Sequence, residues 1–393
     1  MPILYLLATA CFTSAMLVRV TDPLVPEIAR NLSSLPATVA LLGTAFALPY
    51  ALGQPILGPM GDALGKARIM KWCMGLLAVA VFLAAVAPNL EMLFAARILA
   101  GLAGGGTFPL AIAICGDRFP LAERQVALSR VLMAALVGQL FGSIGSGILA
   151  DYIGWRGVMV VAGVITVAAF LLLQWQLVPR PDAVRRKISL ASMRTSYRTV
   201  FANPRAVVCY SAVFVEGICI FGLLPYLAVL LEASGKGSVR EAGFVLAGLG
   251  LGGLLFGVLV KQLLRHLNGQ MNMIRAGGVV AALGFAGYAM NVGWQAQMAS
   301  FVAIGLGFYM IHNSLQTQAT ELAPMERGAA VSLHAFFFFL GHAAGPVLYR
   351  LGMHGVGPKI TILVSALVMS GLGFVVATLL TRAKPMVPVP QSK

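Results

Sequence analysis

The chain has 393 residues, of which 59% are hydrophobic and only 10% are charged, and its mean hydropathy is +0.88. Soluble domains carry roughly 25% charged residues, so this composition excludes a soluble globular protein. The net charge is +15, yet most basic residues fall in loops that would be cytoplasmic if the N-terminus is inside. This distribution follows the positive-inside rule and argues against a nucleic-acid partner.

Apolar segments of about 20 residues, the length that crosses a bilayer core of about 30 Å, recur along the whole chain. Six of them precede a basic stretch and six follow it. The first six spans are expected near 3–24, 37–60, 69–88, 91–115, 126–149 and 157–178. The second six are expected near 206–231, 243–263, 272–291, 295–319, 329–350 and 359–381.

We predict an all-α integral membrane protein whose twelve transmembrane helices form two pseudo-symmetric six-helix bundles. A short motif supports two related halves, because Glu123-Arg-Gln-Val-Ala-Leu-Ser129 returns about 200 positions later as Glu326-Arg-Gly-Ala-Ala-Val-Ser332. A parallel repeat of this kind is a transporter design, with the substrate site near the midplane between the halves. The expected parts are an N-terminal bundle (1–178), a basic cytoplasmic linker (179–205), a C-terminal bundle (206–381) and a cytoplasmic tail (382–393).

The sequence lacks the signatures of other classes of membrane protein. The Walker pattern GxxxxGK[ST] is absent, which removes ATP as an energy source within the chain, and neither GxSxG nor HExxH occurs to support a membrane enzyme. The cysteines and histidines have no metal-ligand spacing, so we read the cysteines as buried apolar residues and expect no metal and no cofactor. A channel would need a selectivity filter or a charge ring completed by several chains, whereas this chain suffices as a monomer.

The loop between the second and third predicted spans carries the most specific motif, Gly58-Pro-Met-Gly-Asp62-Ala-Leu-Gly65-Lys66-Ala-Arg68. Its glycines permit a tight turn, and Asp62 can accept hydrogen bonds at a helix N-terminus. The motif resembles the GxLaDrxGrkx signature of the major facilitator superfamily, with alanine where the family usually has arginine after the aspartate.

Three further stretches strengthen this resemblance. In the fourth span, Arg97-Ile-Leu-Ala-Gly looks like the RxxqGxgaa element of proton-coupled facilitators. The run of glycines in the fifth span is similar to the antiporter signature gxxxGPxxGG, although Ser143 stands where the proline should be. In the first span, Asp22 before a proline looks like the drug/proton antiporter element. The resemblance covers the whole chain and indicates a twelve-span facilitator of the drug/proton antiporter or sugar-efflux-like type.

The resemblance implies alternating access by rocking of the two halves, with a cytoplasmic gate formed by ion pairs between them. The positive-inside rule alone would explain Lys66 and Arg68, whereas it does not require an acid at Asp62. When the family's gate residues are transferred to the matching positions of this sequence, they are Gly58, Asp62, Gly65, Lys66 and Arg68. We expect their charged members to pair with Asp117, Arg118 or Glu326.

Few ionisable residues lie inside the predicted spans, and each costs roughly 2.5 to 3.5 kcal/mol at a span centre, so each is a functional candidate. Glu216 lies about 15 Å into the seventh span, near the midplane. Burial disfavours its charged form, so we expect Glu216 to carry the coupling proton. Asp22, with Arg19 one turn earlier, is the second candidate for proton coupling. Together with Arg97, at a similar depth, Asp22 would either steady the first half or anchor a charged substrate.

Two polar helical stripes are candidates to line a cavity. One holds Tyr50 and Gln54, and the other holds His312 and Gln316, each pair one turn apart. Such side chains serve equally well as contacts between helices. The residues predicted to bind substrate or to form a charge pair are Arg97, Arg19, Tyr50, Gln54, Gln139, His312 and Gln316.

The leading hypothesis is a secondary active transporter, not an enzyme, that couples proton movement to the efflux of a small organic or amphipathic compound. The aromatic run Phe336–Phe339, near which His334 and His342 are expected to pack, would suit such a compound. The alternatives are a proton-linked uptake symporter, an uncoupled facilitator and, ranked lower, a polytopic enzyme or a channel. We expect a multi-pass protein of the plasma membrane, or of the inner membrane in a Gram-negative cell, with both termini cytoplasmic. Its expected partners are protons, membrane lipid and a small-molecule substrate.

Overall fold

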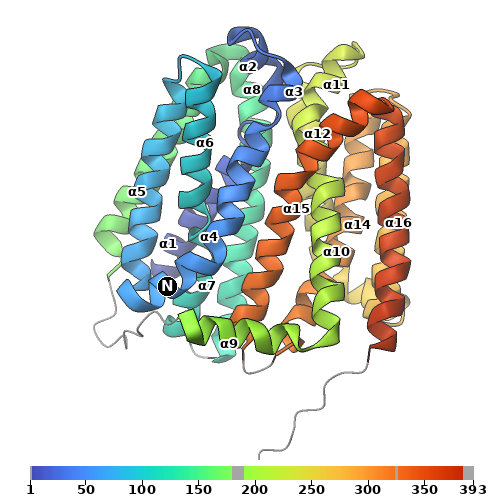
Figure 1. Cartoon of the computed structure of the whole chain (residues 1–393). Helices are drawn as coiled ribbons and strands as arrows, with labels where there is room; N and C mark the ends of the chain where they lie inside the picture. The colour runs from blue at the N-terminus through green and yellow to red at the C-terminus, as the bar shows by residue number, and fades with distance from the viewer. Residues whose placement is uncertain (1, 120, 179–189, 324–325, 384–393) are drawn as a thin grey trace, which may run out of the picture.

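The computed structural model describes residues 2–119, 121–178, 190–323 and 326–383 (Figure 1). Helices make up the regular structure of these residues, and no strand occurs among them, which confirms the predicted all-α class. The helices before residue 178 are α1 (Pro2–Arg19), α2 (Val25–Asn31), α3 (Pro36–Val39), α4 (Leu42–Leu64), α5 (Lys66–Ala85), α6 (Leu90–Gly104), α7 (Thr107–Arg118) and α8 (Leu121–Gln176). Those that follow are α9 (Leu190–Phe201), α10 (Pro204–Phe221), the 3-10 turn η1 (Leu224–Tyr226), α11 (Leu227–Ala233), α12 (Val239–His266), α13 (Gln270–Ala289), α14 (Trp294–Glu321), α15 (Arg327–Gly355) and α16 (Pro358–Arg382).

Nine helical stretches of the described chain are long and apolar enough to cross a membrane. One of them, Arg130–Gln176, has 47 residues and would extend about 70 Å as a straight helix, more than twice the bilayer core. Gly154 interrupts the helical geometry of α8 with a φ of 66°, so α8 supplies two spans. With α1, of 18 residues, and α13, of 20 residues, the described helices provide one segment for each of the twelve spans that the sequence predicts.

Several predicted spans are not single straight helices. α1 stops at Arg19, ahead of Pro23, so the predicted first span ends early and the short α2 follows. The fourth span is interrupted at Gly105 and Gly106 between α6 and α7, where glycine weakens the helix. The seventh is interrupted by η1, which contains Pro225, because proline cannot donate a helical hydrogen bond. Most of the other helix ends fall within a few residues of the predicted boundaries.

The helices form two groups that lie side by side (Figure 1). In the first group α1 packs along α8, and in the second α13 packs against α14 and α16. The groups meet where α4 packs against α15 and where α8 packs against α12. The start of α1, the helix α9 and the end of α16 lie at one end of the molecule, and α2, α3 and α11 lie at the other (Figure 1). Helix α9 falls inside the stretch predicted only as a linker.

Small residues allow close contacts between helices at two glycine-rich stretches. A side chain at Gly101 would collide with the carbonyl oxygen of Phe46, and one at Gly252 with that of Val302. These positions therefore serve packing, as close approach between membrane helices requires. All five cysteines are buried and unpaired, which agrees with their reading as small apolar residues.

Candidate functional site

The few ionisable side chains enclosed by the described spans gather near the interface of the two groups of helices. Arg19, Asp22, Arg97 and Glu216 are all buried, and the most exposed of them, Arg19, is only 4% exposed. Burying a charge costs free energy unless the charge is paired and hydrogen-bonded. The partners of these four side chains therefore determine what each of them can do.

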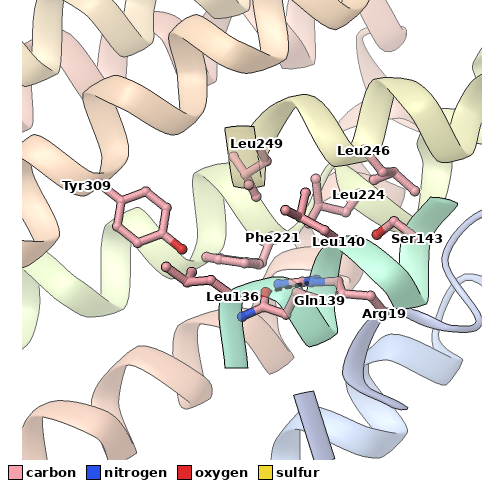
Figure 2. Close-up of a pocket in the computed structure, with 11 residues that line it drawn as sticks. Arg19, Leu136, Gln139, Leu140, Ser143, Phe221, Leu224, Leu246, Leu249 and Tyr309 are labelled. Carbon is pink, nitrogen blue, oxygen red and sulfur yellow. Dashed lines mark hydrogen bonds between the residues drawn. The ribbon is translucent and has the colours of Figure 1, made fainter. Parts of the chain in front are cut away.

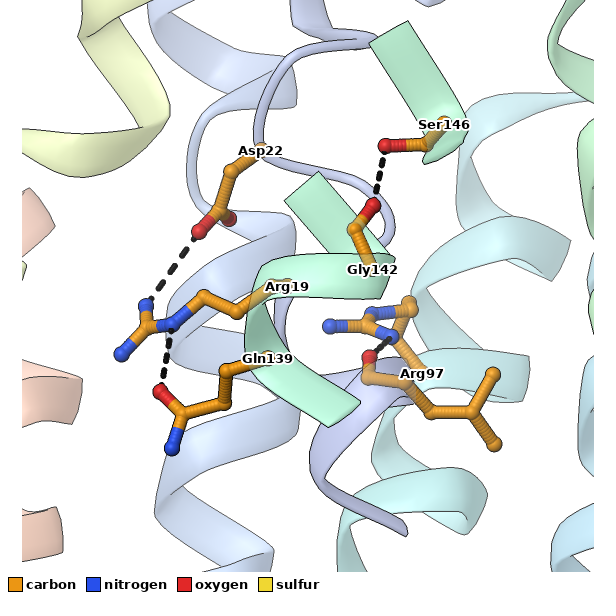
Figure 3. Close-up of polar contacts among 7 residues, drawn as sticks. Arg19, Asp22, Arg97, Gln139, Gly142 and Ser146 are labelled. Carbon is orange, nitrogen blue, oxygen red and sulfur yellow. Dashed lines mark hydrogen bonds and ion pairs between the residues drawn. The ribbon is translucent and has the colours of Figure 1, made fainter. Parts of the chain in front are cut away.

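Arg19 joins the polar contacts at the end of α1 (Figure 3). Its Nη1 lies 3.2 Å from Oδ2 of Asp22, and its Nε donates to Oε1 of Gln139, on α8, at 3.3 Å. Its guanidinium carbon lies 4.5 Å from the centre of the Phe221 ring, on α10. Arg19 thus contacts both groups of helices, and the predicted site residues Arg19, Asp22 and Gln139 belong to one network.

Arg97, on α6, lies beside this network without sharing its hydrogen bonds (Figure 3). Its Nη1 donates to the carbonyl oxygen of Leu17 at 2.9 Å, and its guanidinium carbon lies 4.4 Å from the centre of the Phe46 ring. Asp22 interacts electrostatically with Arg97 but hydrogen-bonds to Arg19. The ion pair of Asp22 is thus with Arg19, because the turn after α1 folds Asp22 back over its own helix end, and a functional pairing of Asp22 with Arg97 stays a prediction.

A small cavity of about 20 Å³ lies beside Arg19 at the interface of the two groups (Figure 2). Its polar lining consists of Arg19, Gln139, Ser143 and Tyr309, and apolar residues of α8, α10, η1 and α12 complete it. This volume holds about one water molecule, whereas drug-sized ligands occupy roughly 300–1,000 Å³. The two groups are therefore closed on each other at this level.

Glu216 is fully buried on α10 and meets His312 from α14. One carboxyl oxygen, Oε1, is in hydrogen-bonding contact with Nδ1 of the imidazole, while Oε2 has no hydrogen-bond partner in the described part of the chain. This carboxyl–histidine pair can exist as a neutral acid with a neutral imidazole or as a carboxylate with an imidazolium. The sequence singled out both residues but missed their contact, because no local pattern relates positions 96 apart.

Two further buried histidines lie on α15. The ring of His334 lies 5.0 Å from that of His312, and neither of its nitrogens has a hydrogen-bond partner among the residues described. His342 packs against Phe221, with ring centres 4.8 Å apart. Both histidines pack on other rings, as the sequence predicts. The imidazole of His334 thus lies beside the carboxyl–histidine pair. The imidazole of His342 interacts electrostatically with the buried arginines.

The remaining predicted lining residues lie on α4 and α14. Tyr50 packs against Phe339 of α15, with ring centres 4.2 Å apart, and so bridges the two groups of helices. Gln54 is buried one turn further along α4, and Gln316 is half-buried one turn beyond His312. Substrate binding by these side chains stays a prediction.

The predicted cytoplasmic gate lies at the end of the molecule that carries α9. Gly65 forms the turn between α4 and α5 with a φ of 99°, a conformation that favours glycine. Nζ of Lys66 lies 2.7 Å from Oδ2 of Asp117, and Nη2 of Arg118 donates to the carbonyl oxygen of Val178 at 2.8 Å. These two contacts join helices of the first group rather than the two groups, so gating by Lys66, Asp117 and Arg118 stays a prediction.

Other parts of the predicted gate are less fully described. Gly58 and Asp62 belong to α4, but their side chains lie outside the described residues, as do those of Glu123 and Arg124 in the repeated motif. Arg68 is exposed on α5, and Glu326 is half-buried just before α15. The role proposed for Asp62 therefore rests on the sequence alone.

Contacts at the opposite end join the two groups directly. Nη1 of Arg30, on α2, lies 2.8 Å from Oε2 of Glu232, on α11. Nearby along the chain, Oγ1 of Thr44 donates to the carbonyl oxygen of Ala343 at 2.7 Å. The sequence did not single out these residues, because each contact joins distant parts of the chain. They hold the groups together at the end away from α9.

Two groups of apolar helices with buried charges at their interface define a multi-pass membrane transport protein of the two-bundle type. The comparison with protein families agrees, since the model of the Major Facilitator Superfamily matches residues 7–346. The chain belongs to this superfamily.

Several curated relatives are similar to most or part of the chain. An uncharacterised MFS-type transporter of Bacillus subtilis, YwfA, is 24% identical over 86% of this chain and 83% of its own length. Multidrug resistance protein 1 of the same organism is 20% identical over 88% of each chain. The efflux pump radE of Floropilus chiversii is 28% identical over 61% of this chain, which spans half of that protein. Multidrug efflux proteins are thus among its relatives.

Proposed function

We propose that the protein is a proton-coupled exporter of a small organic compound that works by alternating access between its two groups of helices. The observation that carries this proposal is the buried carboxyl–histidine pair of Glu216 and His312. Acids inside membrane spans are rare, and they mark proton relays in many transporters. The pair can release one proton and become a carboxylate beside a neutral imidazole, so it is suited to such a relay.

The proton would act by changing the charge that the closed protein must bury. An ionised carboxylate is expensive in a water-free interior, whereas the protonated acid is not. Binding and release of a proton at Glu216 can therefore bias the conformational equilibrium. The groups that face Glu216 are His312 from α14, His334 beyond it from α15 and Cys219 on its own helix. Asp22 is the alternative carrier.

The direction of transport is supported by the relatives, whose names include an efflux pump and a multidrug resistance protein. The pairs of Arg30 with Glu232 and of Thr44 with Ala343 close the end away from α9. If α9 is cytoplasmic, this conformation is closed toward the outside, as an exporter must be while it loads.

The orientation follows from the positive-inside rule, which assigns the basic linker, the start of α1 and the end of α16 to the cytoplasm of a plasma membrane. All five native cysteines are buried, so an introduced cysteine can be labelled selectively. Arg194→Cys, at an exposed site on α9, should react with an impermeant maleimide only after the cells are opened. Labelling in intact cells would reverse the orientation.

Transport in proteoliposomes tests the coupling. The wild-type protein should move a fluorescent drug identified by a thermal-stabilisation screen faster when a pH gradient is imposed, and a protonophore should abolish the acceleration. Glu216→Gln should bind the drug but lose the acceleration, whereas the matched control Glu91→Gln, at an exposed acid, should keep it. A wild-type rate that ignores the gradient would indicate an uncoupled facilitator. Retained acceleration in Glu216→Gln, with loss in Asp22→Asn, would move the proton path to the first span.

A further inference from the structure

The polar groups beside α1 and α6 carry more positive than negative charge. We call Arg19, Asp22, Arg97 and His342 the arginine cluster. Its two guanidiniums stay protonated in proteins, and Asp22 is its one carboxyl group. Arg19, Asp22 and Arg97 are 4%, 2% and 3% exposed, so bulk water does not screen the surplus positive charge.

Within the arginine cluster, Arg19 and Asp22 compensate each other and Arg97 is left over. Arg19 uses its guanidinium for Asp22 and for Gln139. Arg97 has one hydrogen bond, to the carbonyl oxygen of Leu17, while its Nε and Nη2 have no hydrogen-bond partner within the described ranges. Buried guanidinium nitrogens without hydrogen-bond partners are costly, so this position favours an anion that hydrogen-bonds to Arg97.

Rings from both groups of helices surround the arginine cluster. Phe46 lies under Arg97 and Phe221 under Arg19, at 4.4 and 4.5 Å from the guanidinium carbons. His342 lies beside Phe221, and its Nδ1 has no hydrogen-bond partner within the chain as described. The surroundings thus combine unpartnered polar nitrogens with flat apolar surfaces.

We propose that the transported compound is an amphipathic organic anion. Its carboxylate accepts hydrogen bonds from Nε and Nη2 of Arg97, and its apolar body lies against the rings of Phe46 and Phe221. Adjacent guanidinium N–H groups match the two oxygens of a carboxylate, and aromatic rings give the apolar body a large contact area. This inference rests on the proposed function, since it names the class of compound that the proposed exporter would carry.

The charge of such a substrate has a consequence for energetics. When one proton enters and one monovalent anion leaves, two charges cross the membrane in the same electrical sense. An interior-negative potential and an inward proton gradient therefore both drive export of the anion. With the same proton, export of a neutral compound would move one charge, and export of a monovalent cation would move none.

A matched series of probes on the full-length purified protein tests the substrate class. The probes 4-phenylbutyrate, 4-phenylbutan-1-ol and 4-phenylbutylamine share an apolar body and differ only in the polar head. We expect the carboxylate to bind at least tenfold more tightly than the alcohol and the amine to bind most weakly, measured by calorimetry in chloride-free buffer. Arg97→Gln should weaken carboxylate binding at least tenfold and leave alcohol binding unchanged. Arg97→Lys should bind the carboxylate with an affinity between those of Arg97→Gln and the wild type. Arg350→Gln, at an exposed arginine, should bind it as tightly as the wild type does.

Several outcomes would overturn the proposal. These are tighter binding of the amine, unchanged carboxylate binding in both Arg97 variants, or stabilisation by chloride alone without competition from 4-phenylbutyrate. If the variants do not fold, the order in which the wild type binds the three probes still decides whether the site prefers an anion. The two proposals fail separately, because binding is measured without a gradient. Carboxylate binding without proton-driven transport would overturn only the proposed proton-coupled export. Proton-driven export of the amine alone would overturn only the proposal that the substrate is an anion.

Discussion

The two buried polar regions of the interior differ in the chemistry of their charges. The arginine cluster contains two guanidiniums and one carboxyl group, of which Arg19 and Asp22 are joined by an ion pair. The carboxyl–histidine pair of Glu216 and His312 contains only groups that can become neutral. A guanidinium stays protonated across the physiological pH range, whereas an acid beside an imidazole changes the net charge of the pair by one whenever it gains or loses a proton.

Because of this difference, we expect the two buried regions to have different roles in transport. A permanent positive charge is suited to holding an anion, because its attraction does not depend on pH. A titratable pair is suited to coupling, because its charge changes with the proton that it carries. The phenyl ring of Phe221 lies between the regions, 4.5 Å from the Arg19 guanidinium carbon and 5.1 Å from the centre of the Phe338 ring. The His312 ring lies 4.7 Å beyond Phe338.

The largest effect is expected from removing the one carboxylate of the arginine cluster. Asp22→Asn leaves two buried guanidiniums without a counter-charge, and breaking a buried ion pair costs about 3–5 kcal/mol. The thermal midpoint in detergent should therefore fall strongly, while Asp151→Asn, at an exposed acid, should leave it unchanged. A stable Asp22→Asn protein would contradict the view that this region holds fixed charge.

Removing the imidazole of the carboxyl–histidine pair should cost less stability than the loss of Asp22. His312→Leu leaves Glu216 without its hydrogen-bond partner, at a cost of about 1–3 kcal/mol, because the acid can remain as a buried neutral group. Transport should lose its acceleration by a pH gradient while substrate binding survives. The control is His354→Leu, at an exposed histidine of α15. Full acceleration in His312→Leu would show that the imidazole takes no part in coupling.

The ion pair at the end away from α9 should contribute little to stability and more to turnover. Arg30 is exposed, and such pairs are worth about 0–1 kcal/mol. Arg30→Glu places like charges opposite each other and should alter the transport rate severalfold by opening that end more readily. The exchange Arg30→Glu with Glu232→Arg should restore the rate. If the single and exchanged variants transport alike, the pair does not hold the groups closed.

The smallest effect is expected at Glu27, a half-buried acid of α2 that accepts a hydrogen bond from the Trp155 amide at 2.9 Å. Burial raises the pKa of Glu27 above its ordinary value, although the Trp155 amide offsets part of that rise. A raised pKa in the folded state means that stability is lost as pH rises through the range of titration. Glu27→Gln keeps an acceptor oxygen and does not titrate. Its thermal midpoint should therefore rise relative to that of the wild type as the pH increases from 4 to 7. A higher thermal midpoint of the variant at pH 4 only would contradict the raised pKa of Glu27.

The sequence predicted the all-α class, the spans and most of their approximate ends. This was possible because the length of an apolar segment and the charges at its ends are local properties of the chain. It also identified Glu216, His312, Asp22, Arg19 and Arg97 as candidates, since an ionisable residue in an apolar span is conspicuous wherever it lies. The helix breaks before η1 and after α6 were harder to foresee, because glycine and proline also occur inside intact membrane helices.

Tertiary structure alone decided which candidates on different helices meet. The partner of Glu216 lies 96 positions away on another helix, and Gln139 lies 120 positions from Arg19. Asp22 hydrogen-bonds to the arginine on its own chain segment because a turn ends α1 there. Arg97 donates one hydrogen bond to a backbone carbonyl, and two of its nitrogens have no partner in the part of the chain that the structure describes. Spans are set by the apolar length of single helices, whereas pairing depends on how those helices rotate and pack against one another, which no short stretch of sequence encodes.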